Sequence, residues 1–357
     1  MHGDSIESVS AFEAIVLPSV APWLLLGLQA HLLDAAAPGL TPVLLVHTHP
    51  GRALSLGRYH PWDGPAERAG IFAWRRLTGG RVLGSGEGWV GLSIIASHPG
   101  ALLAERDAAI TAERVMNRYV RGLLSAFKAL GIDAFYPGRD AITARGREIA
   151  ACSFEVNSAG AILFEAFVAV NRGMEEVVHD LERFDPDGEL PSRIYGPDSA
   201  SKLVRELDCD IGFDELVQAI VAGYASSFGE AIRRSLSAVE HAQAEHRGAA
   251  MEAAGWLQSL VADPRCATTA RIGAQLGTVE ARLGLAADGS IERFQLLGDF
   301  IANSPALGRL ESELRGNSLD DPGAISRAIR KILDNRENFI LGAGDPDNLA
   351  KLISRAR

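Results

Sequence analysis

The sequence predicts an α/β protein in which a large domain of mixed helices and strands precedes a small α+β domain. Its 357 residues exceed what one hydrophobic core usually organises, so two domains are expected. Helix-like and strand-like apolar patterns alternate through the first part of the chain. A second group of strand-like and helical patterns follows Pro264. We therefore expect a large domain over residues 1–255 and a smaller one over residues 256–357.

The large domain starts with helical apolar spacing at residues 20–34. Short apolar runs typical of buried strands follow at residues 42–47, 53–57, 70–74 and 90–96. Residues 109–130 have the spacing of one long amphipathic helix, which Gly131 ends. Strand-like runs at residues 132–136, 148–156 and 162–170 alternate with glycines and predict an antiparallel meander.

From Gly173 the chain turns helical, most clearly at residues 214–228 and 229–260. After Pro264, strands are expected at residues 272–283 and 291–297, and helices at residues 305–315 and 322–335. No internal repeat or low-complexity linker interrupts this order. The small domain should therefore pair a small sheet with a few helices.

The composition excludes two classes of function. The formal net charge is −10 and the hydrophobic content 47%, whereas a general binder of nucleic acid or of membrane surfaces needs a broad positive field. We therefore expect neither as a partner, and any anion site must be local. Cys152, Cys209 and Cys266 form no disulfide framework and no zinc-type pair. A reducing, cytoplasmic setting is expected, with no bound structural metal, no signal peptide and no transmembrane helix.

Several familiar motifs are absent or incomplete. Gly86, Gly88 and Gly91 match the spacing of a dinucleotide fingerprint, but that fingerprint opens a helix, and here a strand should follow. Neither a nucleophile elbow nor a P-loop occurs. His47-Thr48-His49-Pro50 resembles the start of a JAMM-type zinc site, yet its later ligands are missing, so a turn is expected. Cys152 lies in an apolar run and should simply pack.

One basic segment stands out from the acidic chain: Arg75-Arg76-Leu77-Thr78-Gly79-Gly80-Arg81. Adjacent glycines allow backbone N–H groups to converge on an anion. Guanidinium groups bind phosphate or carboxylate through paired hydrogen bonds. A solvated basic loop is the plainer interpretation, but the segment is the best candidate for an anion-binding loop.

This segment resembles the signature of the lipoate-protein ligase A family, usually Arg-Arg-x-[Ser/Thr]-Gly-Gly-Gly-x-Val. Other stretches resemble the family's landmarks in the same order over some 280 residues. They are Leu56-Gly57-Arg58-Tyr59-His60-Pro61-Trp62, Tyr136-Pro137-Gly138-Arg139-Asp140, Arg147-Glu148-Ile149-Ala150-Ala151, residues 226–233 as a helix, Trp256, and residues 291–300 ending in Gly298-Asp299-Phe300. The resemblance implies the biotin/lipoate ligase fold, with mixed sheets and a small accessory C-terminal domain.

The resemblance also implies an activity. Members of the family activate lipoic or a related acid with Mg-ATP as an acyl adenylate, then transfer the acyl group to a lysine of a carrier domain. The nucleotide would then be held by Arg75, Arg76, Thr78, Gly79, Gly80 and Asp140, with Arg58 as a second phosphate contact. On this basis we expect ATP and Mg²⁺ as cofactors, and a small carboxylic acid and a lipoyl-type carrier as partners.

The site residues depart from the family's pattern in several places. Glu148 occupies the position of the family's active-site lysine, and Arg81 replaces the third glycine. Close to the phosphate a carboxylate should repel an adenylate, unless a rearrangement compensates. Arg147 cannot replace the lysine without a β-bulge, because neighbouring strand residues point to opposite faces. We therefore expect Arg81 to supply the missing positive charge and Glu148 to act as a base. Phe164-Glu165-Ala166 also replaces a common His-His-Gly.

Three hypotheses follow from these departures. The first is a lipoate ligase-like enzyme with an altered acid or acceptor. The second is a catalytically degenerate relative that binds a nucleotide, a lipoyl domain or a partner ligase as an accessory subunit. The third is an ATP-independent octanoyl-type transferase that carries acyl groups on Cys152.

Overall fold

The computed structural model describes residues 11–356, except 63, 69, 101–110, 185–198 and 261–262. The helices are α1 Pro22–Ala35, α2 Ala112–Tyr119, α3 Arg121–Ala129, α4 Met174–Phe184, α5 Leu203–Leu207, α6 Phe213–Phe228, α7 Ala238–Ala253, α8 Ser304–Leu314, α9 Pro322–Leu333 and α10 Pro346–Ser354, with a 3₁₀ turn at Trp256–Gln258. The strands of the first domain are β1 Ala11–Leu17, β2 Val43–His47, β3 Arg52–Leu56, β4 Glu67–Arg68, β5 Ile71–Arg75, β6 Leu83–Gly86, β7 Trp89–Ala96, β8 Ala134–Phe135, β9 Ala141–Ala144, β10 Arg147–Val156, β11 Ile162–Ala169 and β12 Glu230–Arg233. Those of the second are β13 Thr268–Gly273, β14 Thr278–Leu285, β15 Ile291–Gly298, β16 Ile301–Ala302 and β17 Ile340–Leu341.

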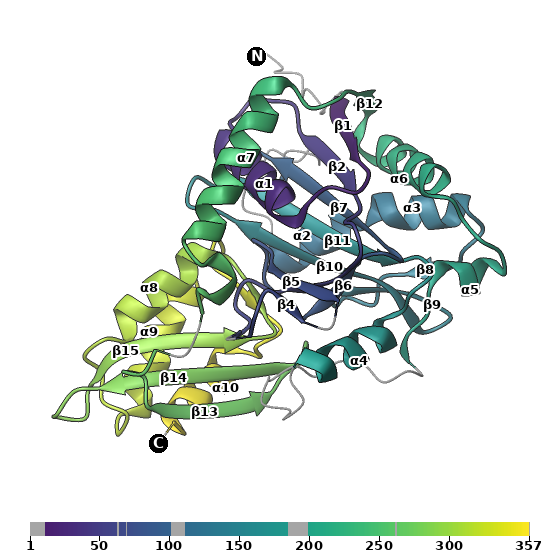
Figure 1. Ribbon diagram of the computed structural model, residues 1–357. Coiled ribbons are helices and arrows are strands. Elements are labelled where there is room, and N and C mark those ends of the chain that lie inside the picture. Colours follow the sequence, from purple (N-terminus) through teal and green to yellow (C-terminus); the bar gives the residue numbers. More distant parts are fainter. Residues whose placement is uncertain are drawn as a thin grey trace, which may run out of the picture.

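A large mixed sheet forms the centre of the first domain (Figure 1). Its strand order is β12-β1-β2-β7-β11-β10-β9-β8. β1 runs parallel to both β12 and β2, whereas the ladders from β2 to β8 are antiparallel. A second sheet, in the order β4-β5-β3-β6, contains the parallel pair β3 and β5. The expected mixed α/β architecture and the antiparallel meander of β8 to β11 are confirmed.

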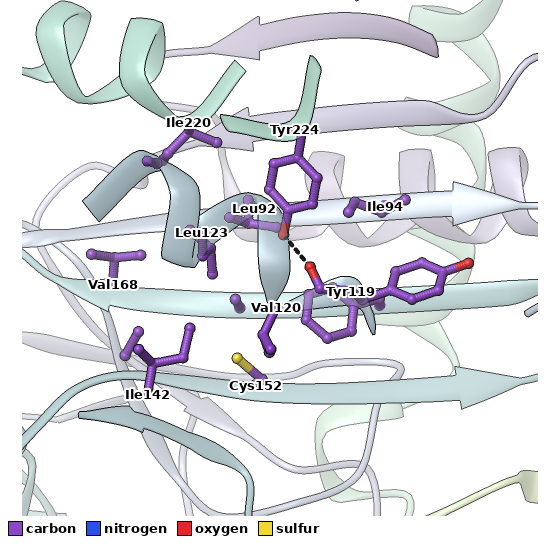
Figure 2. Close-up of a cluster of buried hydrophobic side chains, with 14 of the residues drawn as sticks. Leu92, Ile94, Tyr119, Val120, Leu123, Ile142, Cys152, Val168, Ile220 and Tyr224 are labelled. Atoms are coloured by element: carbon purple, nitrogen blue, oxygen red, sulfur yellow. Dashed lines mark hydrogen bonds between the residues drawn. The ribbon is translucent and has the colours of Figure 1, made fainter. Parts of the chain in front are cut away.

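The large sheet is buried on both faces. One face packs on α2, α3 and α6 through an aromatic and aliphatic core that includes Tyr119, Leu123 and Tyr224. Figure 2 shows this core, in which the Tyr224 hydroxyl donates a hydrogen bond of 2.9 Å to the Tyr119 carbonyl. The other face packs on the second sheet and α1. The second sheet therefore holds the loop that follows β5 against the large sheet.

Helices α1 and α7 pack together through small residues. A Cβ added at Gly27 would lie 2.0 Å from the Ala244 carbonyl oxygen, and one at Gly248 would lie 2.3 Å from that of Trp23. Only glycine permits so close an approach of two helix backbones. α7 begins with a capping box, in which Ser237 and Glu240 satisfy each other's backbone amides.

The C-terminal domain combines the antiparallel sheet β13-β14-β15 with α8, α9 and α10 (Figure 1). Its short strand β16 lies against β10 of the first domain. The Tyr59 and Phe300 rings stack with centroids 4.8 Å apart, and the Gly298 amide donates to the Tyr59 carbonyl. The two domains therefore meet beside the loop that follows β5.

Four expected elements are wrong in their extent or type. The helix expected at residues 229–260 is the strand β12 followed by α7, because Gly229, with φ 109°, ends α6 and the next residues pair with β1. The helical interpretation of residues 226–233 fails for the same reason. Residues 272–283 are not one strand: they hold the end of β13, the turn at residues 274–277 and most of β14. The long helix breaks between α2 and α3 at Val120, and its residues 109–110 lie outside the described part.

Candidate active site

The Arg75 to Arg81 loop connects β5 to β6 and lies between the two sheets of the first domain. Residues 75–82 are buried, with Arg75, Arg76 and Thr78 each at 0% exposure. A segment with three arginines is ordinarily solvated. Here its burial means that every guanidinium must find partners inside the protein.

The Arg75 side chain contacts residues 57–60, which follow β3, and Leu257 of the 3₁₀ turn. Its Nη1 donates to the carbonyls of Gly57, Arg58 and His60, at 3.1, 3.0 and 2.6 Å. Its Nε and Nη2 donate to the Leu257 carbonyl, at 3.0 and 2.7 Å. Burial, followed by the nearby arginine charges, lowers the pKa of Arg75 to about 9, so it stays a cation at neutral pH.

Arg76 wraps around its own loop. Its Nη2 donates to the carbonyls of Gly79 and Arg81 at 2.6 and 2.7 Å, and its Nη1 donates to that of Ser55 at 2.8 Å. Its Nε donates to the Thr78 hydroxyl at 3.1 Å. These bonds fix the curvature of the loop, and burial lowers the pKa of Arg76 to about 10.

The two glycines approach the C-terminal domain. The Gly80 amide donates to the Phe300 carbonyl at 2.6 Å, and a Cβ on Gly79 would lie 2.3 Å from the same oxygen. Gly80 has φ 89°, a conformation that favours glycine. Ser153 of β10 donates to the Gly79 carbonyl at 2.9 Å. In this arrangement the Gly80 N–H group, which an anion could otherwise use, donates to the partly negative Phe300 carbonyl oxygen.

Arg81 forms a buried ion cluster with the two carboxylates singled out from the sequence. Its Nε lies 2.6 Å from Asp140 Oδ2 and its Nη2 lies 2.9 Å from Glu148 Oε1. Asp140 Oδ1 is buried without a hydrogen-bond partner. Burial, together with the Asp140 charge, raises the pKa of Glu148 to about 7, against the opposing effect of Arg81. The structure thus brings together Glu148 and Arg81, the two residues expected from the sequence to depart from the family's pattern.

Glu148 lies beside an irregularity in β10. The register with β9 shifts between Glu148 and Ala150, which is a β-bulge. Arg147 nevertheless points away from the cluster and pairs with Glu206 at 2.9 Å. The expected opposite orientation of neighbouring side chains at this position is confirmed.

Glu165 of β11 belongs to this site and was not among the residues chosen from the sequence. It accepts hydrogen bonds from Thr78 at 2.6 Å and from Gln29 at 2.7 Å, and Gln29 also donates to Ser93. Burial raises the pKa of Glu165, while Thr78 and Arg76 act in the opposite direction. A single glutamate within the apolar run of β11 was the signal that could have identified it, because an unpaired charge is rarely buried there.

The C-terminal domain contributes a second set of contacts. Glu155 of β10 accepts hydrogen bonds from the Ser304 amide and hydroxyl, each at 2.7 Å, at the start of α8. Burial raises the pKa of Glu155 to about 7, and it raises that of Asp299 to about 7 as well. These carboxyls lie where the two domains meet, next to Tyr59, whose hydroxyl donates to the Ala302 carbonyl at 3.2 Å.

Cys152 lies on the opposite face of β10, in the hydrophobic core of Figure 2. Its side chain is 2% exposed, and burial, followed by the charges of Asp140 and Glu148, raises its pKa well above the ordinary value. A thiol held protonated in an apolar core is a poor nucleophile.

Gly86 and Gly88 lie at the hairpin between β6 and β7, so the expectation of a strand rather than a nucleotide-binding helix is confirmed. Within the described ranges, no three His, Cys, Asp or Glu side chains form a metal-binding group, and no helix could span a membrane.

Comparisons with known proteins give one sequence family and one fold. The sequence model of the lipoyl protein ligase A/B catalytic domain matches residues 22–225. Curated protein sequences give no match. The structure is similar to P. falciparum LipL1 in complex with lipoate, with a TM-score of 0.70, 12% identity and coverage of 97% of this chain and 100% of that chain.

Two further solved structures share the fold. One is a lipoate-protein ligase A bound with ATP, with a TM-score of 0.56, 15% identity and coverage of 71% of this chain and 100% of that chain. The other is a bi-partite lipoate protein ligase from Thermoplasma acidophilum, described with its E2 lipoyl domain, with a TM-score of 0.55, 15% identity and coverage of 71% and 98%. At these low identities the likeness shows the fold alone.

Proposed function

The chain belongs to the lipoyl protein ligase A/B catalytic domain family, and from this premise we propose that it activates a carboxylic acid with ATP and transfers the acyl group to an amine. In the first step a carboxylate oxygen attacks the α-phosphorus of ATP, and pyrophosphate leaves. In the second step the amine attacks the acyl carbon, AMP leaves and an amide forms. The proton lost by the amine passes to a base.

The observation that carries the proposal is the presence of two fully buried guanidinium groups that form no direct ion pair within the described part of the chain, although the Glu165 charge acts on Arg76 from a greater distance. Arg75 and Arg76 donate to backbone carbonyls and to Thr78, and neither forms an ion pair with a described residue. A buried charge is costly unless a counter-charge compensates it. The loop therefore maintains a positive potential where the negative charge of an adenylate and of the departing pyrophosphate would develop.

Arg81 and Glu148 take the roles for which the family uses a lysine. The Arg81 guanidinium compensates the Glu148 carboxylate, which removes the repulsion that an isolated glutamate would exert on a phosphate. Glu148 Oε1 accepts from Arg81. With a pKa of about 7, Glu148 suits the removal of the amine proton near neutral pH.

Mg²⁺ would enter with ATP. Asp140 Oδ1 is a buried carboxylate oxygen without a hydrogen-bond partner, and oxygen is the ligand that Mg²⁺ prefers. Because the described residues supply no group of three candidate ligands, the phosphates and water would provide the remaining coordination. The ion would neutralise phosphate charge there.

The substrate class follows from the family and its relatives. LipL1 is described in complex with lipoate, and the Thermoplasma ligase with its E2 lipoyl domain. We therefore propose lipoate or a related acid as the acyl donor and a lysine of a carrier domain as the acceptor. An incoming phosphate would have to displace the Phe300 carbonyl from the Gly80 amide.

That last contact favours a second candidate function. The Gly80 donor is occupied by Phe300, and the donors of Arg75 and Arg76 are engaged within the chain. A protein that keeps this arrangement would be an accessory subunit that binds a nucleotide or a lipoyl domain without turnover.

Pyrophosphate release distinguishes the two functions. The full chain is incubated with Mg-ATP and a panel of acids that includes lipoate and octanoate. Acid-dependent release supports the ligase. Binding of ATP or of a lipoyl domain by calorimetry, without release with any acid, supports the accessory role and contradicts the ligase.

A further inference from the structure

A cavity of about 640 Å³ lies at the junction of the two domains, and no residue of the Arg75 to Arg81 loop lines it. We call it the junction cavity. The first domain contributes Phe154 and Val115, and the C-terminal domain contributes Arg309, Arg336 and Phe339. Its volume is within the range of pockets that hold small molecules, which often lie between domains. None of the proposed active-site residues lines it.

The floor of the junction cavity is aromatic and held in place. The Phe154 and Phe339 rings stack with centroids 4.8 Å apart and an angle of 28° between their planes. Asn303, which is 3% exposed, holds the Phe339 segment by accepting from the Phe339 amide at 3.0 Å and donating to the Glu337 carbonyl at 3.1 Å. Because Asn303 comes from the start of α8, both sides of the floor are fixed by the fold. A flat apolar group would gain contact area here without ordering loose side chains.

The rim of the junction cavity offers positive charge that the protein does not neutralise. Arg309 donates to the Asn338 side chain, and Asn338 in turn donates to the Ile332 carbonyl. Arg336 has no hydrogen bond or ion pair in the described part of the chain, and Arg309 has no ion pair there. Most arginines of the C-terminal domain do pair with carboxylates, for example Arg271 with Glu280. The rim also contains Glu337, so the two guanidiniums leave one net positive charge.

His98 also lines the junction cavity and adds a directed donor. His98 Nδ1 accepts from the Gly100 amide at 3.1 Å, so the neutral ring carries its proton on Nε2. Guanidinium groups and an imidazole N–H together suit a carboxylate, sulfonate or phosphate. We propose that the junction cavity binds a small organic anion whose flat apolar body lies on the Phe154 and Phe339 rings and whose charged end meets Arg309 and Arg336.

This site is separate from the proposed ligase site. Phe154 is six residues beyond Glu148 along β10, roughly 20 Å at the rise of a strand. Its side chain packs in the hydrophobic core on the face of β10 opposite to Ser153, which contacts the Gly79 carbonyl. The ligand would contact both domains, so its binding would stabilise their junction. The proposal does not depend on the ligase activity, since no residue of the Arg81 cluster takes part.

Calorimetric titration with 2-naphthoate tests the proposal. We expect a dissociation constant of about 1 mM or tighter for the wild type, with a rise in melting temperature, and weaker binding of the neutral 2-naphthylmethanol. Arg309→Gln/Arg336→Gln should weaken 2-naphthoate about tenfold. The matched control is Arg315→Gln, which removes an exposed arginine of the same domain that does not line the cavity.

Three results would overturn the proposal. They are no binding of 2-naphthoate at millimolar concentration, equal affinity for the acid and the alcohol, or unchanged affinity in Arg309→Gln/Arg336→Gln. Val156→Phe offers a second variant, because Val156 lines the cavity and a larger ring there should exclude the probe. If Val156→Phe folds, as its melting curve reports, and still binds 2-naphthoate as the wild type does, the site lies elsewhere.

Discussion

At the scale of single residues, the main feature is an exchange of charge between two positions. By the resemblance of the sequence, Arg81 stands where the family usually has a glycine and Glu148 where it has a lysine, and the two side chains meet at 2.9 Å. Without Arg81, the Glu148 and Asp140 carboxylates would be buried without the counter-charge that both now contact. The pair is therefore best understood as one coupled change that keeps a cation near the Gly79 and Gly80 turn.

The coupling predicts strongly non-additive stability. Glu148→Lys alone sets an ammonium against Arg81 and should lower the free energy of unfolding by about 3 to 5 kcal/mol. Arg81→Gly in addition removes the repulsion and should recover most of that loss. Urea unfolding of both single variants and the double variant measures the interaction. Additive losses would show that the two positions do not act as a pair.

The sequence predicted part of this site and missed the rest for a physical reason. Arg81, Asp140 and Glu148 were singled out by motif, and the fold brings them together across separate strands. Glu165 was noted only as a departure from the family, although it accepts from Thr78. Its role depends on β11 lying opposite the loop, which is long-range pairing that no local pattern reveals.

At the scale of elements, glycines decide how the helices pack. Gly27 of α1 meets the Ala244 and Gly248 backbone of α7, and α1 packs on one face of the large sheet. The helix expected at residues 20–34 agrees with α1. The helix expected at residues 229–260 begins too early, because α7 begins only at Ala238. The composition of residues 230–233 gives no sign that they pair with β1 as an edge strand.

Gly27→Ala should separate the two helices. Its Cβ would lie 2.0 Å from a backbone oxygen that cannot rotate away, so we expect a loss of about 1 to 3 kcal/mol in the free energy of unfolding. Gly308→Ala is the control, because no atom lies within 4 Å of the new Cβ on the exposed α8. It should gain about 0.5 to 1 kcal/mol. Equal effects of the two changes in chemical denaturation would refute the packing argument.

At the scale of the whole molecule, buried carboxyls give stability an unusual pH dependence. Burial raises the pKa of Glu148, Glu155 and Asp299 to about 7. At any pH between the pKa that these carboxyls have in the unfolded chain and pH 7, the folded state therefore binds more protons than the unfolded state. The free energy of unfolding therefore decreases as the pH rises through this range. Glu240 and Asp263 have pKa values lowered to about 2, so they are protonated only at a lower pH. There the free energy of unfolding decreases as the pH falls.

We expect the free energy of unfolding to decrease from about pH 5 to about pH 7, by about 1 to 3 kcal/mol for each fully buried carboxyl. Glu155→Gln keeps an acceptor for Ser304 and should flatten this decrease. Denaturant titrations at successive pH values measure both curves. A rise in stability over this range, or an identical slope in the variant, would contradict the assignment.

The overall architecture was the most predictable property. The alternation of helix and strand patterns and the order of landmarks along the chain identified the mixed sheets and the C-terminal domain correctly. The contact between Phe300 and the Gly80 amide could not be foreseen, because it joins residues more than two hundred positions apart across two domains. It occupies the Gly80 amide, one of the donors of the proposed phosphate site.

The most direct test of the account is ATP–pyrophosphate exchange, measured with the acid panel on the wild type, Arg81→Gln and Arg81→Lys. We predict acid-dependent exchange by the wild type, a loss of about a hundredfold in Arg81→Gln, and partial recovery in Arg81→Lys. Melting curves would show whether each variant remains folded. Exchange by folded Arg81→Gln at the wild-type rate, or no exchange by the wild type with any acid, would contradict the claim that Arg81 provides the cation for acid activation.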